Sequence, residues 1–166
     1  MPVECSISIR RILLPKDTNH RGEVFGGALL AEIDLAGAAE ARKWTAHDVA
    51  TVAVKEVVFK HPVKVGDVVT FWTSLVGIGT TSIQVQVEVE ASRDGSPSPV
   101  SVTAATVVYV AIAPDGVGGI KKVPVNSCPR CGSEVQRTNL SPPDTGEAIG
   151  CTRCEWPNDP VMSPKL

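Results

Sequence analysis

The segment from Ile83 to Glu90 alternates strictly between apolar and polar side chains. A strand with this pattern has one buried face and one wet face, which is typical of an antiparallel sheet that is covered on one side. Stretches rich in Val, Ile and Thr predict strands at 6–14, 51–59, 68–77, 81–91 and 100–113. Another part of the chain must therefore cover this sheet.

The long run without proline from Gly26 to about Thr45 is the helix candidate that can cover the sheet. Its many glycines and alanines would let strands pass close to it. One strand, one helix and four further strands predict an α+β protein in which a long central helix is wrapped by a curved antiparallel sheet, the layout of the hotdog fold. Because such a sheet has edges to protect, we expect an oligomer.

The charges and the apolar runs exclude several classes of partner. The 16 basic and 18 acidic residues nearly cancel and form no block of like charge, so neither a nucleic acid nor a membrane surface is indicated. No apolar run approaches the roughly 18 to 20 residues of a membrane span. Residues 1–6 lack the basic-then-apolar layout of a secretory signal, and we therefore expect a cytoplasmic protein.

Asp34 is the candidate catalytic group of the helix. A helical wheel places Glu32 and Glu40 together on one side, where we expect a solvated stripe. Asp34 stands on the opposite side among small and apolar residues. Burying a carboxylate there costs free energy unless it is hydrogen-bonded, paired with a positive charge or used in a reaction. It could be structural, paired with Lys55 or Lys60, or it could act on a substrate.

The start of the helix and the loop before it add further candidates. Gly26 and Gly27 offer backbone N–H groups at the positive end of the helix dipole, which suits a carbonyl oxygen that gains negative charge; the alternative is close packing on the sheet. Asn19 could orient a water or a carbonyl, or be an ordinary turn residue. With no Gly-x-Ser-x-Gly elbow, the groups favour general-base attack of water on an activated acyl group such as a thioester.

Segments 17–27 and 33–37 together resemble the signature of the hotdog acyl-CoA thioesterases, the bacterial broad-specificity group and its eukaryotic cytosolic relatives. The resemblance continues through 51–54, 59–67 and 79–82 to about Val110. It implies an enzyme that hydrolyses acyl-CoA to free fatty acid and CoA. It also implies a homo-oligomer, often a trimer of hotdog dimers, with active sites at the dimer interface.

The same resemblance implies roles for individual residues. Asp34 would activate water, Asn19 would come from the facing protomer, and the backbone around Gly26 and Gly27 would hold the thioester oxygen. The residues expected near CoA are Gly79, Thr80, Thr81, Ser82, Lys60 and His61. The family often carries Arg or Lys directly before the proline, where this chain has His61 with Lys60 one place earlier.

Two other functions are compatible with these patterns. A hotdog hydratase or dehydratase acting on a thioester usually pairs a histidine with the acidic residue, and none of His20, His47 and His61 lies in the predicted helix. A non-catalytic regulator that binds acyl-CoA would need only the fold and the ligand site. The Asn19 and Asp34 pair favours the hydrolase over such a regulator.

The last part of the chain carries four cysteines in two Cys-x-x-Cys pairs, Cys128 with Cys131 and Cys151 with Cys154. Four thiolates close a tetrahedral shell, so the spacing predicts a structural zinc site of the ribbon type. Iron is a weaker alternative, and disulfides come last in a reducing compartment. We therefore predict a hotdog domain at 1–122 and a four-cysteine metal-binding appendage at 123–166.

Overall fold

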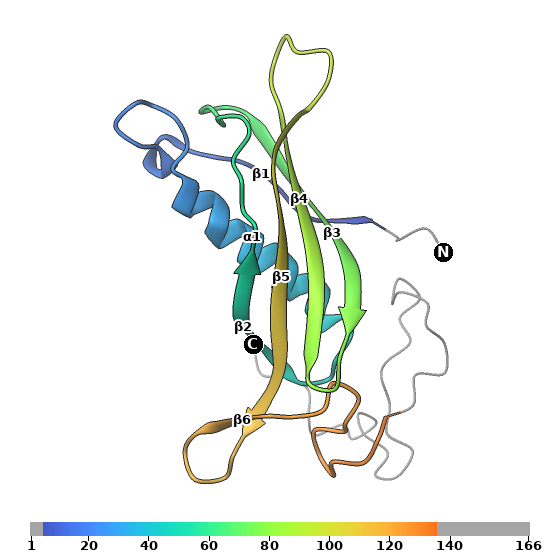
Figure 1. The fold of residues 1–166 in the computed structure, drawn as a ribbon. Coiled ribbons are helices and arrows are strands. Elements are labelled where there is room, and N and C mark those ends of the chain that lie inside the picture. The colour runs from blue at the N-terminus through green and yellow to red at the C-terminus, as the bar shows by residue number, and fades with distance from the viewer. Residues whose placement is uncertain (1–4, 136–166) are drawn as a thin grey trace, which may run out of the picture.

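In the computed structural model, which describes residues 5–135, one helix runs obliquely across one face of a curved antiparallel sheet (Figure 1). The elements are β1 Ser6–Ile12, a 3-10 turn at Pro15–Asp17, α1 Gly26–Arg42, β2 Asp48–Lys55, β3 Val68–Ile78, β4 Ser82–Ser92, β5 Val100–Pro114 and β6 Ile120–Lys122. The strand order is β1-β3-β4-β5-β2, and β6 pairs with the end of β5. The predicted helix wrapped by a curved sheet is confirmed.

The alternating segment behaves as its pattern predicts. Val85, Val87 and Val89 of β4 are fully buried, whereas the intervening Gln86 and Glu88 lie on the other face. The core lies between this face of the sheet and α1, and burying each valine removes apolar surface worth roughly 1.5 kcal/mol or more from water. Burial on one face fixes the register, because a slip by one residue would expose every valine.

The predicted solvated stripe of the helix is wrong. Glu40 is only 5% exposed, and its carboxylate accepts hydrogen bonds from Trp44 Nε1 at 3.0 Å and Thr73 Oγ1 at 3.2 Å and pairs with Lys43 Nζ at 2.9 Å. Burial by itself raises the pKa of the Glu40 carboxyl, but these bonds outweigh it and lower the pKa. The acidic side of α1 faces the sheet with its charges satisfied.

The end of one strand and an additional short strand also differ from the prediction. Strand β2 ends at Lys55 rather than near Phe59, because Glu56 takes a left-handed backbone conformation with φ +50°. The short strand β6 follows the turn after Pro114 and pairs with Ile112–Pro114 in antiparallel register. The chain beyond Lys122 therefore starts against the sheet.

The cysteine appendage lies only partly within the described residues. Cys128 is buried and Cys131 is exposed, whereas Cys151 and Cys154 lie outside them. Among residues 5–135, no group of three or more His, Cys, Asp or Glu side chains is arranged to hold a metal ion. In the same range, no helix has the length and apolar character needed to cross a membrane.

Candidate active site

The Asp34 carboxylate is half-buried on α1 and bonded to the edge strand of the sheet. Thr51 of β2 donates its hydroxyl hydrogen to Asp34 Oδ1 at 2.5 Å, a length typical of a hydroxyl bonded to a charged carboxylate. A β-bulge follows at once, between Thr51 and Ala53, and bulges of this kind re-aim a side chain near a site. The bond occupies one oxygen of Asp34, and the other oxygen accepts no hydrogen bond from the described residues.

The main chain of Asp34 is held from the opposite side by Tyr109 of β5. The Tyr109 hydroxyl donates to the Asp34 carbonyl oxygen at 2.8 Å, and its ring is fully buried. Gly37 makes this approach possible, because a Cβ at that position would collide with the phenol oxygen. Burial, and secondarily the Asp34 charge, raise the pKa of Tyr109, so the hydroxyl stays a neutral donor.

The alternatives considered for Asp34 gain no support. Neither Lys55 nor Lys60 forms an ion pair with it among residues 5–135. The chain's three histidines, all within this range, have no hydrogen bond to Asp34 either. A carboxylate with a threonine donor, and without a histidine, suits general-base chemistry better than hydration or dehydration.

The helix start presents two backbone donors. Gly26 and Gly27 are the first residues of α1, where N–H groups have no partner within the helix, and no acceptor for them is found in the described part of the chain. A Cβ at Gly26 would lie 3.5 Å from the ring of Phe59, and at Gly27 it would collide with the ring of Phe25. These glycines pack against aromatic rings that are themselves 43% and 60% exposed.

Asn19 both shapes its loop and keeps a donor available. Its side-chain oxygen accepts hydrogen bonds from the Arg21 N–H at 2.8 Å and the Glu23 N–H at 3.3 Å. The side-chain NH2 group of Asn19 donates to no residue in the range 5–135. The loop thus holds the amide as a fixed hydrogen-bond donor.

The predicted catalytic groups do not come together within one chain. Asp34 lies seven residues after Gly27 on α1, which is about 10 Å along a helix at 1.5 Å per residue. Asn19 lies in the loop that leads into this helix start. One chain therefore carries two separate groups, Asp34 with Thr51, and the helix start with Asn19.

The residues expected near CoA are also divided. Ser82, at the end of the β3–β4 turn, pairs with Val110 of β5. Lys60 bonds through its N–H to the Val102 carbonyl, and His61 Nδ1 donates to the Ser101 carbonyl at 2.9 Å. Val102 and Val110 are eight residues apart on one strand, about 26 Å at 3.3 Å per residue. The β3–β4 turn and Lys60–His61 lie toward opposite ends of the sheet.

The edge of the sheet next to Asp34 has no strand partner within the described residues. Strand β2 is the last in the sheet order, and its Val52 and Val54 are 50% and 44% exposed. Leu30 and Leu35 of α1 are exposed on the helix beside it. Exposed edges with apolar side chains are usually covered by another chain in native proteins.

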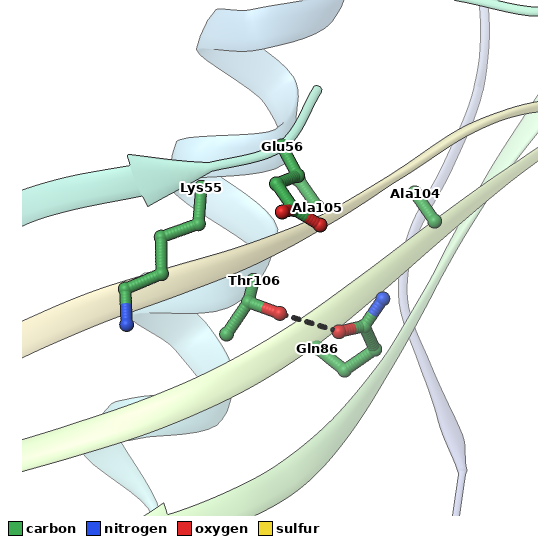
Figure 2. A pocket seen from close by; sticks show the side chains of 6 residues that line it. All are labelled: Lys55, Glu56, Gln86, Ala104, Ala105 and Thr106. Atoms are coloured by element: carbon green, nitrogen blue, oxygen red, sulfur yellow. Dashed lines mark hydrogen bonds between the residues drawn. The ribbon is translucent and has the colours of Figure 1, made fainter. Parts of the chain in front are cut away.

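A separate hollow lies in the sheet face that points away from α1, where β2 ends and Glu56 turns the chain away from β5 (Figure 2). It has a volume of about 740 Å³ and is lined by Lys55, Glu56, Gln86, Ala104, Ala105 and Thr106. Thr106 donates to Gln86 Oε1 at 2.8 Å across it. None of the predicted catalytic residues lines this hollow.

Sequence comparison gives one clear group of relatives. The family model described as the thioesterase superfamily matches residues 21–98. The chain is 39% identical over 111 residues to the acyl-CoA thioester hydrolase YciA of Salmonella typhimurium, covering 65% of this chain and 84% of the relative. The Escherichia coli K12 protein of the same name is 38% identical over the same coverage.

Solved structures agree with these relatives. A hexameric hotdog fold thioesterase of Campylobacter jejuni superposes with a TM-score of 0.65 at 42% identity, covering 72% of this chain and 89% of that one. An acyl-CoA hydrolase from Staphylococcus aureus in complex with butyryl-CoA and CoA superposes with a TM-score of 0.62 at 30% identity, covering 73% and 72%. Both matches leave about a quarter of this chain uncovered.

Proposed function

The chain belongs to the hotdog-fold thioesterase family and is an acyl-CoA thioester hydrolase, and we propose that Asp34 is its general base. The observation that carries this proposal is the bond from Thr51 to one oxygen of Asp34, which leaves the second oxygen to bind a water. Sequence reasoning missed Thr51, because a threonine in a strand-rich segment carries no signal of its own.

The reaction follows from these groups. Asp34 removes a proton from water as the water oxygen attacks the thioester carbonyl carbon, and the carbonyl oxygen becomes negative. Backbone N–H groups at a helix start stabilise that charge, a role we assign to Gly26 and Gly27. When the C–S bond breaks, the CoA thiolate leaves with the proton held by Asp34, and the acyl group departs as the free fatty acid.

Each active site takes its groups from two protomers in this proposal. Asp34 and Thr51 would face Asn19 and the helix start of the partner subunit, because one chain separates the two sets by about 10 Å or more. Pairing of β2 edges about a two-fold axis would bring the sets together and cover Val52 and Val54. We further propose a hexamer built as a trimer of such dimers, since the Campylobacter jejuni thioesterase is hexameric.

The CoA-binding residues follow the same division. Gly79, Thr80, Thr81 and Ser82 would meet the CoA part of the substrate from one protomer. Lys60 and His61, toward the other end of the sheet, would reach the same CoA only from the partner subunit. Two protomers per site thus account for both sets.

A thiol-release assay tests the assignment of the base. Asp34→Asn should lower kcat for acyl-CoA hydrolysis by about a hundredfold or more, the scale of lost general-base catalysis. Sedimentation velocity should give the same mass as the unsubstituted enzyme. Full activity in a correctly assembled Asp34→Asn enzyme would refute Asp34 as the base.

We also propose that Cys128, Cys131, Cys151 and Cys154 hold a structural zinc ion. The first pair supports this locally: the Gly132 N–H donates to the Cys128 carbonyl at 2.9 Å, with Gly132 at φ +72°, so the pair lies in a tight turn. The second pair lies outside the described residues. The thiols would stay reduced in the cytoplasm, where we place the enzyme.

Metal content tests the cysteine proposal directly. The purified chain should contain one zinc per protomer by mass spectrometry of the metal, and Cys128→Ser with Cys131→Ser should lose it. Iron in place of zinc would show as a coloured protein. A chain with neither metal in any preparation would refute the site.

A further inference from the structure

The segment that follows β6 is bonded to the β3–β4 turn, the turn expected near CoA. The Val125 N–H donates to the Thr80 carbonyl at 2.9 Å, and the Val123 N–H donates to the Ala111 carbonyl at 2.9 Å. In Figure 1 this segment passes beneath the turn at the lower end of the sheet. Residues 123–135 are called the clasp below.

The clasp is also anchored to the chain that follows α1. Thr45 donates its hydroxyl hydrogen to the Val125 carbonyl at 2.9 Å. Ser127 donates its single hydroxyl hydrogen to the Pro124 carbonyl, so at 2.9 Å it accepts from His47 Nε2. Thr45, His47 and Ser127 are all buried, where a hydrogen bond that is lost leaves a costly unpaired group.

Apolar burial adds to these bonds. Val125, Cys128 and Val135 are 4%, 1% and 4% exposed, and the Val135 N–H donates to the Asn126 carbonyl at 2.6 Å. Val125 belongs to the core cluster of the hotdog domain, and the bond from Val135 to Asn126 closes the backbone of the clasp on itself. The clasp therefore packs on the hotdog domain and is not a free linker.

Docking changes which groups the β3–β4 turn offers to solvent. The Thr80 carbonyl accepts from the Val125 N–H of the clasp, and the Thr81 carbonyl accepts from the Ala111 N–H of β5 at 2.9 Å, so the carbonyls of the two central residues of the turn both have partners. The N–H and hydroxyl groups of Thr80 and Thr81 donate to nothing in the range 5–135. A turn whose central carbonyls are bonded and whose donors are open suits an anion.

Positive charge lies close by. Lys121 and Lys122 of β6 are exposed, and Lys122 directly precedes Val123, which is bonded to the same Ala111 that bonds Thr81. Lysine serves as a point charge for phosphate in many sites. The backbone of Lys122 therefore lies next to the residues that bond the turn.

From these contacts we propose that the clasp holds the β3–β4 turn as a phosphate-binding element for the CoA part of the substrate, with Thr80, Thr81 and Lys122 as its donors. The proposal rests on the acyl-CoA hydrolase function given above and assigns a substrate-recognition role to the start of the appended segment. The clasp acts as a positioning element, because its own contacts are with the turn and with the residues after α1.

The test loosens the clasp without touching the turn. Thr45→Val with Ser127→Ala removes both buried anchoring bonds and changes little volume. The matched control, Thr106→Val with Ser96→Ala, removes two hydrogen bonds elsewhere in the molecule, at the outer hollow and in the β4–β5 loop. Substrates are an acyl-CoA, its 3′-dephospho form and the S-acyl pantetheine, which lacks all phosphates.

The proposal predicts a loss confined to phosphate-bearing substrates. In the clasp variant, amide exchange of the peptide covering Val123–Val125, whose N–H groups donate to the Ala111 and Thr80 carbonyls, should become about tenfold faster, as expected for two lost anchoring hydrogen bonds. KM for acyl-CoA should rise about tenfold with kcat within twofold, and KM for S-acyl pantetheine should stay the same. If 3′-dephospho-CoA substrate is unaffected, the 3′-phosphate is the group bound; if it is affected, the diphosphate is.

Two results would overturn the proposal. Faster exchange at Val123–Val125 with unchanged KM for acyl-CoA would make the clasp a structural element only. Unchanged exchange at Val123–Val125 would show that the two anchoring bonds do not hold the clasp on the turn. The exchange measurement needs no turnover, so failure of the clasp is separable from failure of Asp34 as the base. Lys122→Glu gives a second route, with the same expected rise in KM for acyl-CoA alone.

Discussion

Thr51 and Tyr109 are direct cross-strand partners on β2 and β5, and both donate a hydrogen bond to Asp34, one to its carboxylate and one to its main-chain carbonyl. One cross-strand pair of the sheet therefore holds Asp34, the proposed general base, at two points. Cross-strand neighbours keep a fixed spacing of about 5 Å. The position of Asp34 thus depends on the strand register as well as on the helix.

Removing the Thr51 hydroxyl should slow the reaction without weakening substrate binding. Thr51→Val keeps the shape but frees the carboxylate to rotate, and kcat should fall about tenfold, the equivalent of roughly 1.4 kcal/mol. Thr51→Ser retains the donor and should stay within about threefold of the parent. Steady-state kinetics with one acyl-CoA measures both, and equal kcat values for the two variants would contradict a role for the hydroxyl.

Mixing two inactive variants tests the two-protomer site. In a dimer of one Asn19→Ala chain and one Asp34→Ala chain, one site has both substitutions and the other has neither. Random co-assembly should therefore restore roughly a quarter of the parent activity, as two-fold symmetry requires. If Asn19 and Asp34 of the same chain worked together, the mixed oligomers would be as inactive as either variant alone.

Stability measurements test the contact of Tyr109 with the helix. Tyr109→Phe removes one buried hydrogen bond and should lower the free energy of unfolding by about 1 kcal/mol. Gly37→Ala forces a methyl group against the phenol oxygen and should cost about 1 to 3 kcal/mol. Combining the two should cost less than their sum in urea unfolding, since the phenol oxygen is then absent. If the two losses of unfolding free energy simply added, the methyl group at position 37 would not be in contact with the phenol oxygen.

The ion pair of Asp67 and Arg93 predicts a stability term that depends on pH. Asp67 is 2% exposed, and Arg93 donates to it from Nε at 2.8 Å and from a terminal nitrogen at 2.6 Å. The Arg93 hydrogen bond lowers the pKa of Asp67, despite an opposing effect of burial. The pair joins the turn before β3 to the end of β4.

Because the pKa of Asp67 is lower in the folded protein than its unfolded value of about 3.9, the unfolded chain binds more protons at acid pH. The stabilisation is complete above about pH 4 and is lost as the pH falls through the folded pKa. Asp67→Asn should lose on the order of 2 kcal/mol at neutral pH and unfold with a weaker acid dependence. Acid titrations of the two proteins, followed by circular dichroism, measure this difference. An equal pH dependence of unfolding in both proteins would contradict this role of Asp67.

The fold was predictable because its main signals are local. The alternation of Ile83–Glu90 and the proline-free run from Gly26 each determine an element from neighbouring residues alone. The wheel of α1 failed at Glu40, because the groups that make its burial tolerable, Trp44 and Thr73, include one on a strand far away in the sequence. A helical wheel shows which residues of one helix share a face, and it carries no information about hydrogen-bond partners on other elements.

The candidate site was predictable only in part for a similar reason. Asp34, Gly26 and Gly27 were proposed from the helix pattern, and Asn19 from its place in the preceding loop, with its role taken from the family resemblance. Thr51 reaches Asp34 only because β2 returns beside α1, a tertiary relation without a local signature. Likewise, no feature of a glutamate signals that Glu56 takes a left-handed conformation and ends β2 early.

The hydrogen bond between Tyr109 and Asp34 has a practical consequence, because Tyr109 is the only tyrosine of the chain. A fluorine label introduced through tyrosine therefore gives a single resonance, and it comes from the β5 side chain whose hydroxyl donates to the Asp34 carbonyl. Substrate binding, product release and protomer exchange could each be followed at that contact by one unambiguous spectral line.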